Sequence, residues 1–453
     1  MTNHRNALPP AGPKELWAWC LYDFANSSFT TLIITVAYSV YFVQVVARDL
    51  GSGAAERIWF WGYAISMLLV ALLAPPLGAL ADARAIKRPL LIGSTLLCVA
   101  CTALLFFVER GDVRLGLLLF GLANITFELG FLFCSAFLVE IATPATMGRI
   151  SGYGWGLGYA GGLLSLALAY PFIAGGFGEE NLSLYRLSFV VTAVFFLVAS
   201  LPTLLWLRER AVPQPSATGS SAWRDTFAWL AAMARTITSY RKLFRFLIDY
   251  LIYMTTAITP YRDLFWFLIA YLIYTDAINT VIVASAIFAN KVLDFSPGDL
   301  IIYFLITQVT AGLGAVGFGL LADRIGSTRT ISVTLLIWIG VVVAAAAVQT
   351  HAQFYAIGLV AGAVLGANQA TSRALIGRFV PPGKQGELFG FFTVIGKFAA
   401  VIGPVVYGEV TAWTGNQRWA VLSMALFFII GLLLFQRVDE QRGLAAAQGN
   451  DEL

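Results

Sequence analysis

The chain has 453 residues, of which 59% are hydrophobic and only 12% charged, and its mean hydropathy is +0.78. Soluble globular domains carry about twice that charged fraction, so a soluble protein is excluded. The net charge of +4 is small, and the basic residues lie in short segments between apolar runs, which excludes a nucleic-acid-binding surface. The composition predicts a polytopic membrane protein.

Apolar runs of about 20 residues, the length that crosses a bilayer as a helix, recur along the whole chain. We place twelve of them at residues 17–46, 57–80, 89–108, 114–139, 149–175, 185–207, 264–290, 299–321, 330–349, 352–377, 387–412 and 418–436. The expected fold class is an all-α polytopic membrane protein with twelve transmembrane helices.

The first apolar run contains a carboxylate, Asp23, followed three residues later by Asn26 on the same helical face. An ionisable side chain inside a membrane span is costly, and it persists mostly where it faces a bundle interior or a wet cavity. The same spacing returns in the seventh run at Asp276 and Asn279. Both pairs are therefore candidates for function.

Two further pairs of segments repeat in the same order. Gly78-x-x-x-Asp82 after the second run matches Gly319-x-x-x-Asp323 after the eighth, and residues 136–152 match residues 374–390 without a gap. Together with the Asp and Asn pairs, these matches predict two pseudo-symmetric six-helix bundles. The expected domains are a tail (1–16), a first bundle (17–207), a linker (208–260), a second bundle (261–437) and a tail (438–453).

The linker is polar and contains prolines at its start, then has apolar residues at helical spacing, which fits either an amphipathic surface helix or a solvated linker helix. Residues 240–260 are an imperfect tandem copy of residues 261–280. If this copy crossed the membrane, Asp82 and Asp323 would lie on opposite sides, so we expect it not to cross.

Lys and Arg residues near the span ends are more numerous on the side that holds both termini, which predicts that both termini are cytoplasmic. The four cysteines all lie in apolar runs, so neither a disulfide framework nor a metal site is expected. There is no Walker sequence and no HExxH, so the sequence predicts no cofactor, no ATP-driven pump and no enzyme.

The twelve runs in two similar halves, and Gly-x-x-x-Asp323-Arg324-x-Gly after the eighth run, resemble the major facilitator superfamily. The amino-acid sequence of the first run, from Trp19 through Asp23 and Asn26 to Phe29, is similar to that of the vacuole-effluxer-like branch, and specifically to its bacterial members. The yeast member of that branch exports amino acids from the vacuole. The resemblance implies a secondary transporter that works by alternating access, with substrate bound near the midplane between the halves.

The charged residues placed inside the spans are the candidates for coupling. Burial in a low-dielectric medium favours the neutral form of a carboxylate, so Asp23 and Glu128 are expected to carry protons. Polar residues that could bind the solute are Asn26, Asn124, Asp276, Asn279, Asn368, Gln369 and Lys397. For each of these the alternative is a fixed structural partner, such as an interhelical hydrogen bond.

Charges at the cytoplasmic span ends are expected to form a latch between the two halves. Its members would be Asp82, Arg84, Glu140, Arg149, Asp323, Arg324 and Arg378. The first copy of the loop motif departs from the superfamily pattern, because Ala83 and Ala85 flank a shifted Arg84. Solvated charges at span ends are the alternative.

The function expected from these features is transport of a small polar solute, with amino acids as one class, coupled to a proton or another ion. A monomer in the lipid bilayer is expected, with no nucleic-acid partner. Two alternatives stay open: an exporter of amphipathic compounds or drugs, and a membrane scaffold or receptor that lost transport. Buried charges at Asp23, Glu128 and Asp276 argue against the scaffold, because a scaffold gains nothing from them.

Overall fold

A computed structural model describes residues 11–51, 53–142, 147–210, 261–379, 392 and 395–447. Within these residues twelve helical segments are long and apolar enough to cross a membrane, as the hydropathy pattern predicted. The tandem copy and the amphipathic part of the linker lie outside the described residues. The main helices are α1 (Pro13–Ser28), α3 (Ala54–Arg84), α4 (Lys87–Leu104), α5 (Val113–Ala136), α7 (Met147–Ile173), α8 (Leu182–Trp206), α11 (Arg262–Leu293), α12 (Pro297–Ile325), α13 (Ser327–Ala347), α14 (His351–Phe379), α16 (Ile402–Thr414) and α17 (Gln417–Phe435).

Shorter segments complete the spans. The first span, Pro13–Val46, continues beyond α1 through η2 (Phe29–Val36), α2 (Tyr38–Tyr41) and η3 (Phe42–Val46). The other short helices are η4 (Arg48–Leu50), η5 (Leu105–Phe107), α6 (Leu138–Ile141) and α18 (Glu440–Ala447).

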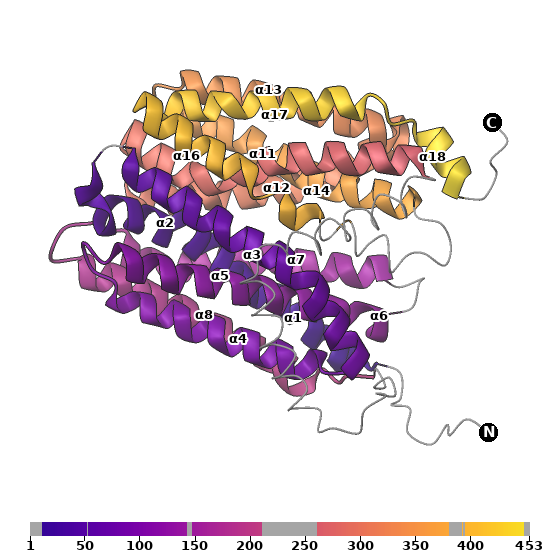
Figure 1. The fold of residues 1–453 in the computed structure, drawn as a ribbon, viewed down its shortest axis with the longest axis horizontal. Helices are drawn as coiled ribbons and strands as arrows, with labels where there is room; N and C mark the ends of the chain where they lie inside the picture. Colours follow the sequence, from indigo (N-terminus) through magenta and orange to yellow (C-terminus); the bar gives the residue numbers. More distant parts are fainter. Residues whose placement is uncertain are drawn as a thin grey trace, which may run out of the picture.

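The helices form two bundles of six spans each, in chain order (Figure 1). The helices from α1 to α8 make the first half, and those from α11 to α17 make the second. The halves lie together at the end where α3 begins at Ala54, which we call the far end. They splay apart toward the end that carries α18, which we call the near end.

The outer faces of both halves are apolar. Leu118, Leu313 and Leu433 expose 67%, 69% and 65% of their surfaces, although they belong to long helices with well-packed inner faces. Exposed leucines on outer helix faces of both halves suit a hydrocarbon surrounding, in which backbone groups are satisfied inside each helix.

At the far end, α3 of the first half packs on α16 of the second half. The rings of Phe60 and Tyr407 lie 4.8 Å apart between their centroids, and Trp61 Nε1 donates to Glu409 Oε1 at 2.7 Å. A Cβ added to Gly53 would lie 3.0 Å from the Ala412 Cα, so the backbones also approach closely. This end is tightly closed.

A buried polar cluster joins the halves beside this contact. Glu56 in the first turn of α3 is 4% exposed; it pairs with Lys291 of α11 at 3.7 Å and accepts from Gln417 Nε2 at 3.3 Å. Gln417 in turn accepts from the Tyr407 hydroxyl at 3.2 Å. We call Glu56, Lys291, Gln417 and Tyr407 the far-end cluster.

At the near end each half is fastened by a similar polar arrangement. In the first half, Glu209 after α8 accepts from the backbone N–H of Lys87 at the start of α4 (2.8 Å), and Arg210 binds Glu15 of α1 (2.7 Å).

In the second half, Glu440 of α18 accepts from the backbone N–H of Thr328 at the start of α13 (2.9 Å). Arg442 likewise binds Asp263 in the first turn of α11 (2.6 Å). In both halves, therefore, a glutamate after the sixth spanning helix caps the third spanning helix. An arginine that follows this glutamate, by one residue in the first half and by two in the second, binds the first spanning helix. The near-end contacts thus repeat between the halves as the sequence segments do.

Candidate functional site

The central charges meet between the two halves. Glu128 lies on the inner face of α5, because it follows Phe120, Asn124 and Phe127 at helical spacing among buried residues. Its carboxylate forms an ion pair with the Lys397 ammonium of the eleventh span, with side chains only 10% and 19% exposed. Lys397 Nζ also lies 5.2 Å from the centre of the Phe131 ring. The structure thus joins a predicted proton carrier to a predicted solute ligand.

A second pair of opposite charges spans the halves nearer to the termini. Asp23 of α1 lies within electrostatic range of Arg373 of α14, and the Arg373 guanidinium lies 4.7 Å from the centre of the Trp155 ring of α7. One turn along α7, the Tyr159 hydroxyl donates to Gln369 Oε1 of α14 at 2.9 Å. The predicted residues Asp23 and Gln369 therefore face a shared interface.

Small residues of α7 bring Asp23 to this position. A Cβ at Gly154 would collide with Asp23 Oδ2, and a Cβ at Gly158 would lie 3.2 Å from the Ser27 hydroxyl. Glycines at four-residue spacing let two membrane helices approach closely. Asn26, one turn after Asp23, is 7% exposed, and its Nδ2 has no hydrogen-bond partner among the described residues.

The matching pair in the second half has different surroundings. Asp276 Oδ2 accepts from the backbone N–H of Gly403 at 2.8 Å, and Asn279 Nδ2 donates to the Ala399 carbonyl at 2.6 Å. Both partners belong to the eleventh span: Gly403 lies in the first turn of α16, and Ala399 lies in the turn just before that helix. These side chains therefore bind backbone of their own half.

Two of the predicted amides bind neighbours inside one bundle. Asn124 Nδ2 donates to Ser66 Oγ of α3 at 2.8 Å, and Asn124 is fully buried. Asn368 Oδ1 accepts from Trp338 Nε1 of α13 at 3.0 Å. These contacts have the form of interhelical hydrogen bonds.

Two of the predicted latch residues, Glu140 and Arg378, form ion pairs with residues of their own halves. Glu140 pairs with Lys87 at 2.8 Å and accepts from the Arg210 backbone N–H, while Arg378 pairs with Glu440 at 2.8 Å. Arg84 is half-buried, and Arg324 is exposed. The side chains of Asp82, Arg149 and Asp323 lie outside the described part of the chain.

The sequence reasoning missed the far-end cluster and the stacking of Arg373 on Trp155. Glu56 and Lys291 stand at the start of the second span and the end of the seventh, which predicted topology places on the same side. Opposite charges at two span ends on one side were the available signal. The sequence prediction considered charges in the middle of spans and therefore did not include Glu56 and Lys291.

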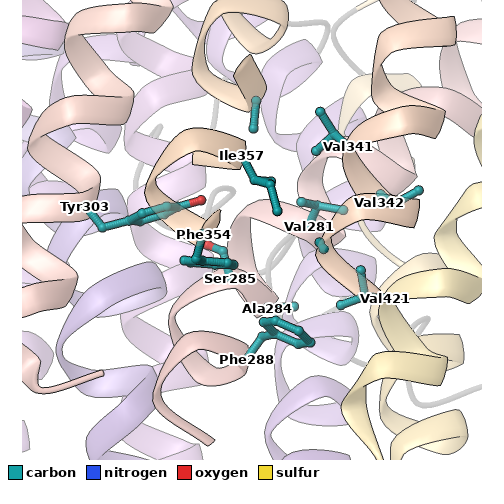
Figure 2. A pocket seen from close by; sticks show the side chains of 12 residues that line it. Val281, Ala284, Ser285, Phe288, Tyr303, Val341, Val342, Phe354, Ile357 and Val421 are labelled. Atoms are coloured by element: carbon teal, nitrogen blue, oxygen red, sulfur yellow. The ribbon is translucent and has the colours of Figure 1, made fainter. Parts of the chain in front are cut away.

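The second half also contains an apolar cavity, shown in Figure 2. Its walls come from α11, α12, α13, α14 and α17, and side chains such as Val281, Phe288, Val342 and Ile357 point into it. Of its two polar residues, Ser285 already donates to the Ile282 carbonyl at 2.7 Å. Among the residues that the structure describes, no charged side chain lines the cavity, so it does not suit a polar solute.

Two six-helix bundles with opposite charges between them define a secondary transporter of the major facilitator superfamily. The sequence profile of the family described as "Vacuole effluxer Atg22 like" matches residues 55–448. The chain therefore belongs to the vacuole effluxer Atg22-like family.

Curated relatives agree with this assignment. The chain is 28% identical over 446 residues to the MFS-type transporter YxiO of Bacillus subtilis, covering 97% of this chain and 98% of YxiO. It is 26% identical to autophagy-related protein 22-1 of Neosartorya fischeri, over 67% of this chain and 51% of that protein. The chain thus spans about half the length of that fungal relative.

Solved structures share the fold at low identity. A bacterial homologue of the human lysosomal transporter Spinster, inward-facing and unoccupied, has a TM-score of 0.67 at 13% identity, covering 97% of this chain and 99% of that one. The nucleoside transporter NupG has a TM-score of 0.65 at 13% identity, covering 94% of this chain and 98% of that one. These likenesses concern the fold.

Proposed function

We propose that this protein moves a small zwitterionic solute, of the amino-acid class, across the membrane by alternating access coupled to protons. The observation that carries the proposal is the ion pair between Glu128 and Lys397, which joins the two halves in the middle of the spans. A zwitterion presents one carboxylate and one ammonium group. The two inter-half charge pairs offer one cation and one anion each, in a largely buried setting.

The coupling follows from exchange of partners. When the carboxylate of a solute binds Lys397, Glu128 loses its counter-ion inside the membrane. An unpaired buried charge costs several kcal/mol, so Glu128 takes up a proton at that moment. Because a zwitterion has no net charge, the net charge between the halves then rises by the single positive charge of the proton.

The remaining predicted residues have roles around these pairs. Asp23 and Arg373 are the second charge pair, and Asn26 and Gln369 supply neutral hydrogen-bonding groups beside it. The predicted latch of Asp82, Arg84 and Asp323 with their neighbours would form when the near end closes.

Topology supports an assignment of the conformation. With both termini in the cytoplasm, as the Lys and Arg bias predicts, the closed far end faces outward and the splayed near end faces inward. We infer an inward-facing monomer in a bacterial inner membrane.

Uptake of amino acids into proteoliposomes, with and without a proton gradient, tests the proposal. Glu128→Gln should lose gradient-driven accumulation by about tenfold or more while keeping solute exchange, because only the protonation step is removed. Lys397→Gln should lose both, because the solute carboxylate has lost its cation.

The exposed Glu180→Gln is the matched control, since it makes the same change far from the charge pairs. Unchanged accumulation and unchanged pH dependence in Glu128→Gln would reject proton coupling at this residue. Efflux of an amphipathic cation dye without any amino-acid uptake would favour the drug-exporter alternative.

A further inference from the structure

The eleventh span is broken into two parts. A helical turn at residues 395–398 is followed by a non-helical turn at 399–401, and α16 then begins at Ile402. Pro404 lies in the first turn of α16. Proline is tolerated there, but it cannot continue a preceding helix, because it has no N–H and its ring collides with the carbonyl four residues earlier. The sequence itself therefore encodes the break.

The seventh span fastens both edges of this break. Asp276, 3% exposed, accepts from the Gly403 backbone N–H at 2.8 Å, and Asn279 donates to the Ala399 carbonyl at 2.6 Å. A carboxylate at a helix N-terminus satisfies free N–H groups and interacts favourably with the helix dipole. A Cβ at Gly403 would collide with Thr280 Oγ1, so α11 and α16 lie in close contact here.

The two sides of the break have different partners in the other half. On the near side, Lys397 pairs with Glu128 of α5. On the far side, α16 carries Tyr407 and Glu409, which contact Phe60 and Trp61 of α3. Only residues 399–401 separate the segment that holds the central charge pair from the helix that closes the far end.

The fifth span, which matches the eleventh in the first half, has no such break among its described residues. Helix α7, which lies against Asp23, runs unbroken from Met147 to Ile173. Asp23 consequently faces the charge of Arg373, whereas Asp276 binds backbone. Asp23 and Asp276 therefore have different binding partners, because the helix beside Asp276 is interrupted and the helix beside Asp23 is not.

We propose that the capped break at residues 399–401 is a hinge that transmits the state of the Glu128–Lys397 pair to the far-end contacts. Asp276 and Asn279 are then positioning residues, which hold α16 at a set angle to the segment that carries Lys397. This inference rests on the proposed function only in taking the charge pair as the element that changes during transport. It assigns Asp276 to the conformational change and away from direct contact with the solute.

Distance measurements between spin labels at the far end test the hinge. Labels at Leu50 and Trp413, both exposed, report whether the two halves are closed there. In the otherwise native protein, Lys397→Gln should raise the population of far-end-open molecules about threefold, because it removes the central pair. In an Asp276→Ala background that response should vanish, whereas Asp276→Asn, which keeps an oxygen for the Gly403 N–H, should preserve it.

Pro404→Ala provides a second route that leaves both side-chain caps in place. It should stiffen the break and reduce the same response to Lys397→Gln. If the response is equal with and without the Asp276 cap and the proline, the hinge is wrong, whatever the transport assays show. If Asp276→Asn loses amino-acid binding while the distance response stays intact, Asp276 is a solute ligand and the inference fails.

Discussion

Asp23 and Asp276 occupy matching places in a duplicated sequence, yet their partners differ. Asp23 lies against the glycines of α7 and faces Arg373 of the other half, while Asp276 caps α16 of its own half. A buried carboxylate needs a compensating group, and each position finds the one that its neighbouring helix offers. Matching residues therefore do not imply matching roles.

Asn124 and Asn26 allow a prediction at the same scale. Asn124→Ala should lower the free energy of unfolding by about 1 kcal/mol, because it removes the hydrogen bond to Ser66 between two helices of one bundle. Denaturant unfolding of purified protein, together with amino-acid uptake, measures both effects.

Asn26→Ala is the matched comparison, since the Nδ2 of Asn26 has no partner among the described residues. It should change uptake more than stability. A variant of Asn124 that unfolds normally but no longer transports would contradict the structural role and restore Asn124 to the solute site.

At the scale of single elements, α18 fastens the near end of the second half. Glu440 is partly buried, which by itself disfavours its charged form, but hydrogen bonds from Thr328 and Ser327 and the nearby Arg378 outweigh burial and lower the pKa of Glu440. Glu209 caps α4 in the same way, yet burial, with Glu140 close by, raises the pKa of Glu209.

These opposite shifts predict opposite pH dependences. A lowered folded-state pKa means that Glu440 stabilises the protein above pH 4.5, the ordinary pKa of a glutamate, and that this stabilisation is lost as the pH falls through the lower folded-state pKa. Glu440→Gln should therefore cost about 1 kcal/mol at pH 7, as the loss of a helix cap does, and progressively less on acidification.

Glu209→Gln is the control with the reverse sign. Because the folded-state pKa of Glu209 is raised, its charged form costs stability above that pKa, and the substitution should be neutral or stabilising at pH 7. Thermal unfolding of the two variants between pH 4 and pH 7 distinguishes them. Parallel pH profiles would show that the two caps are not different in this respect.

At the scale of the whole molecule, closure depends on few polar contacts at the far end. Glu56 binds both Lys291 and Gln417, so it contacts the first spanning helix of the second half, α11, and its last spanning helix, α17. Removing one member of a largely buried ion pair leaves the other without a partner, which is strongly unfavourable. The far-end cluster should therefore set how long this end stays closed.

Glu56→Ala should increase opening of the far end. A single cysteine at Ala412, which contacts Gly53 across the halves, should react with a soluble thiol reagent about threefold faster in this variant. The four native cysteines are free and buried, so a background without them, or a fast reaction, isolates the reporter. Glu109→Gln is the control, because Glu109 pairs with Arg186 inside the first half; an equal increase there would contradict a specific role for Glu56.

Much of the architecture followed from local pattern. Whether a run of residues crosses a membrane depends on its own length and hydropathy, so all twelve spans were predictable before any contact was known. The wording around Asp23 and Asn26 indicated the family, and the family profile confirms it. The coarse function, a secondary transporter, followed with the family.

The candidate site was predictable in its residue types and not in its pairings. A charged residue inside a span is rare because its burial is costly. For this reason, sequence alone could identify the charged residues Asp23, Glu128, Asp276 and Lys397 as candidates. Their partners could not, because a hydrogen bond or ion pair depends on how helices pack and rotate. The residues next to Asp276 in the sequence, for example, do not indicate that its carboxylate accepts a hydrogen bond from the N–H of Gly403.

The sequence by itself determined the spans, the duplication, the family and the identity of the buried charges, since each depends on composition and spacing along one stretch of chain. Only the tertiary structure decided that Glu128 meets Lys397, 269 positions away, that Asp276 caps a broken helix, and that Glu56 pairs with Lys291 at the far end. The physical reason is that a side chain's electrostatic and hydrogen-bonding partner is set by distances of a few ångströms in space. Those distances arise from the packing of twelve helices together, and no single helix contains them.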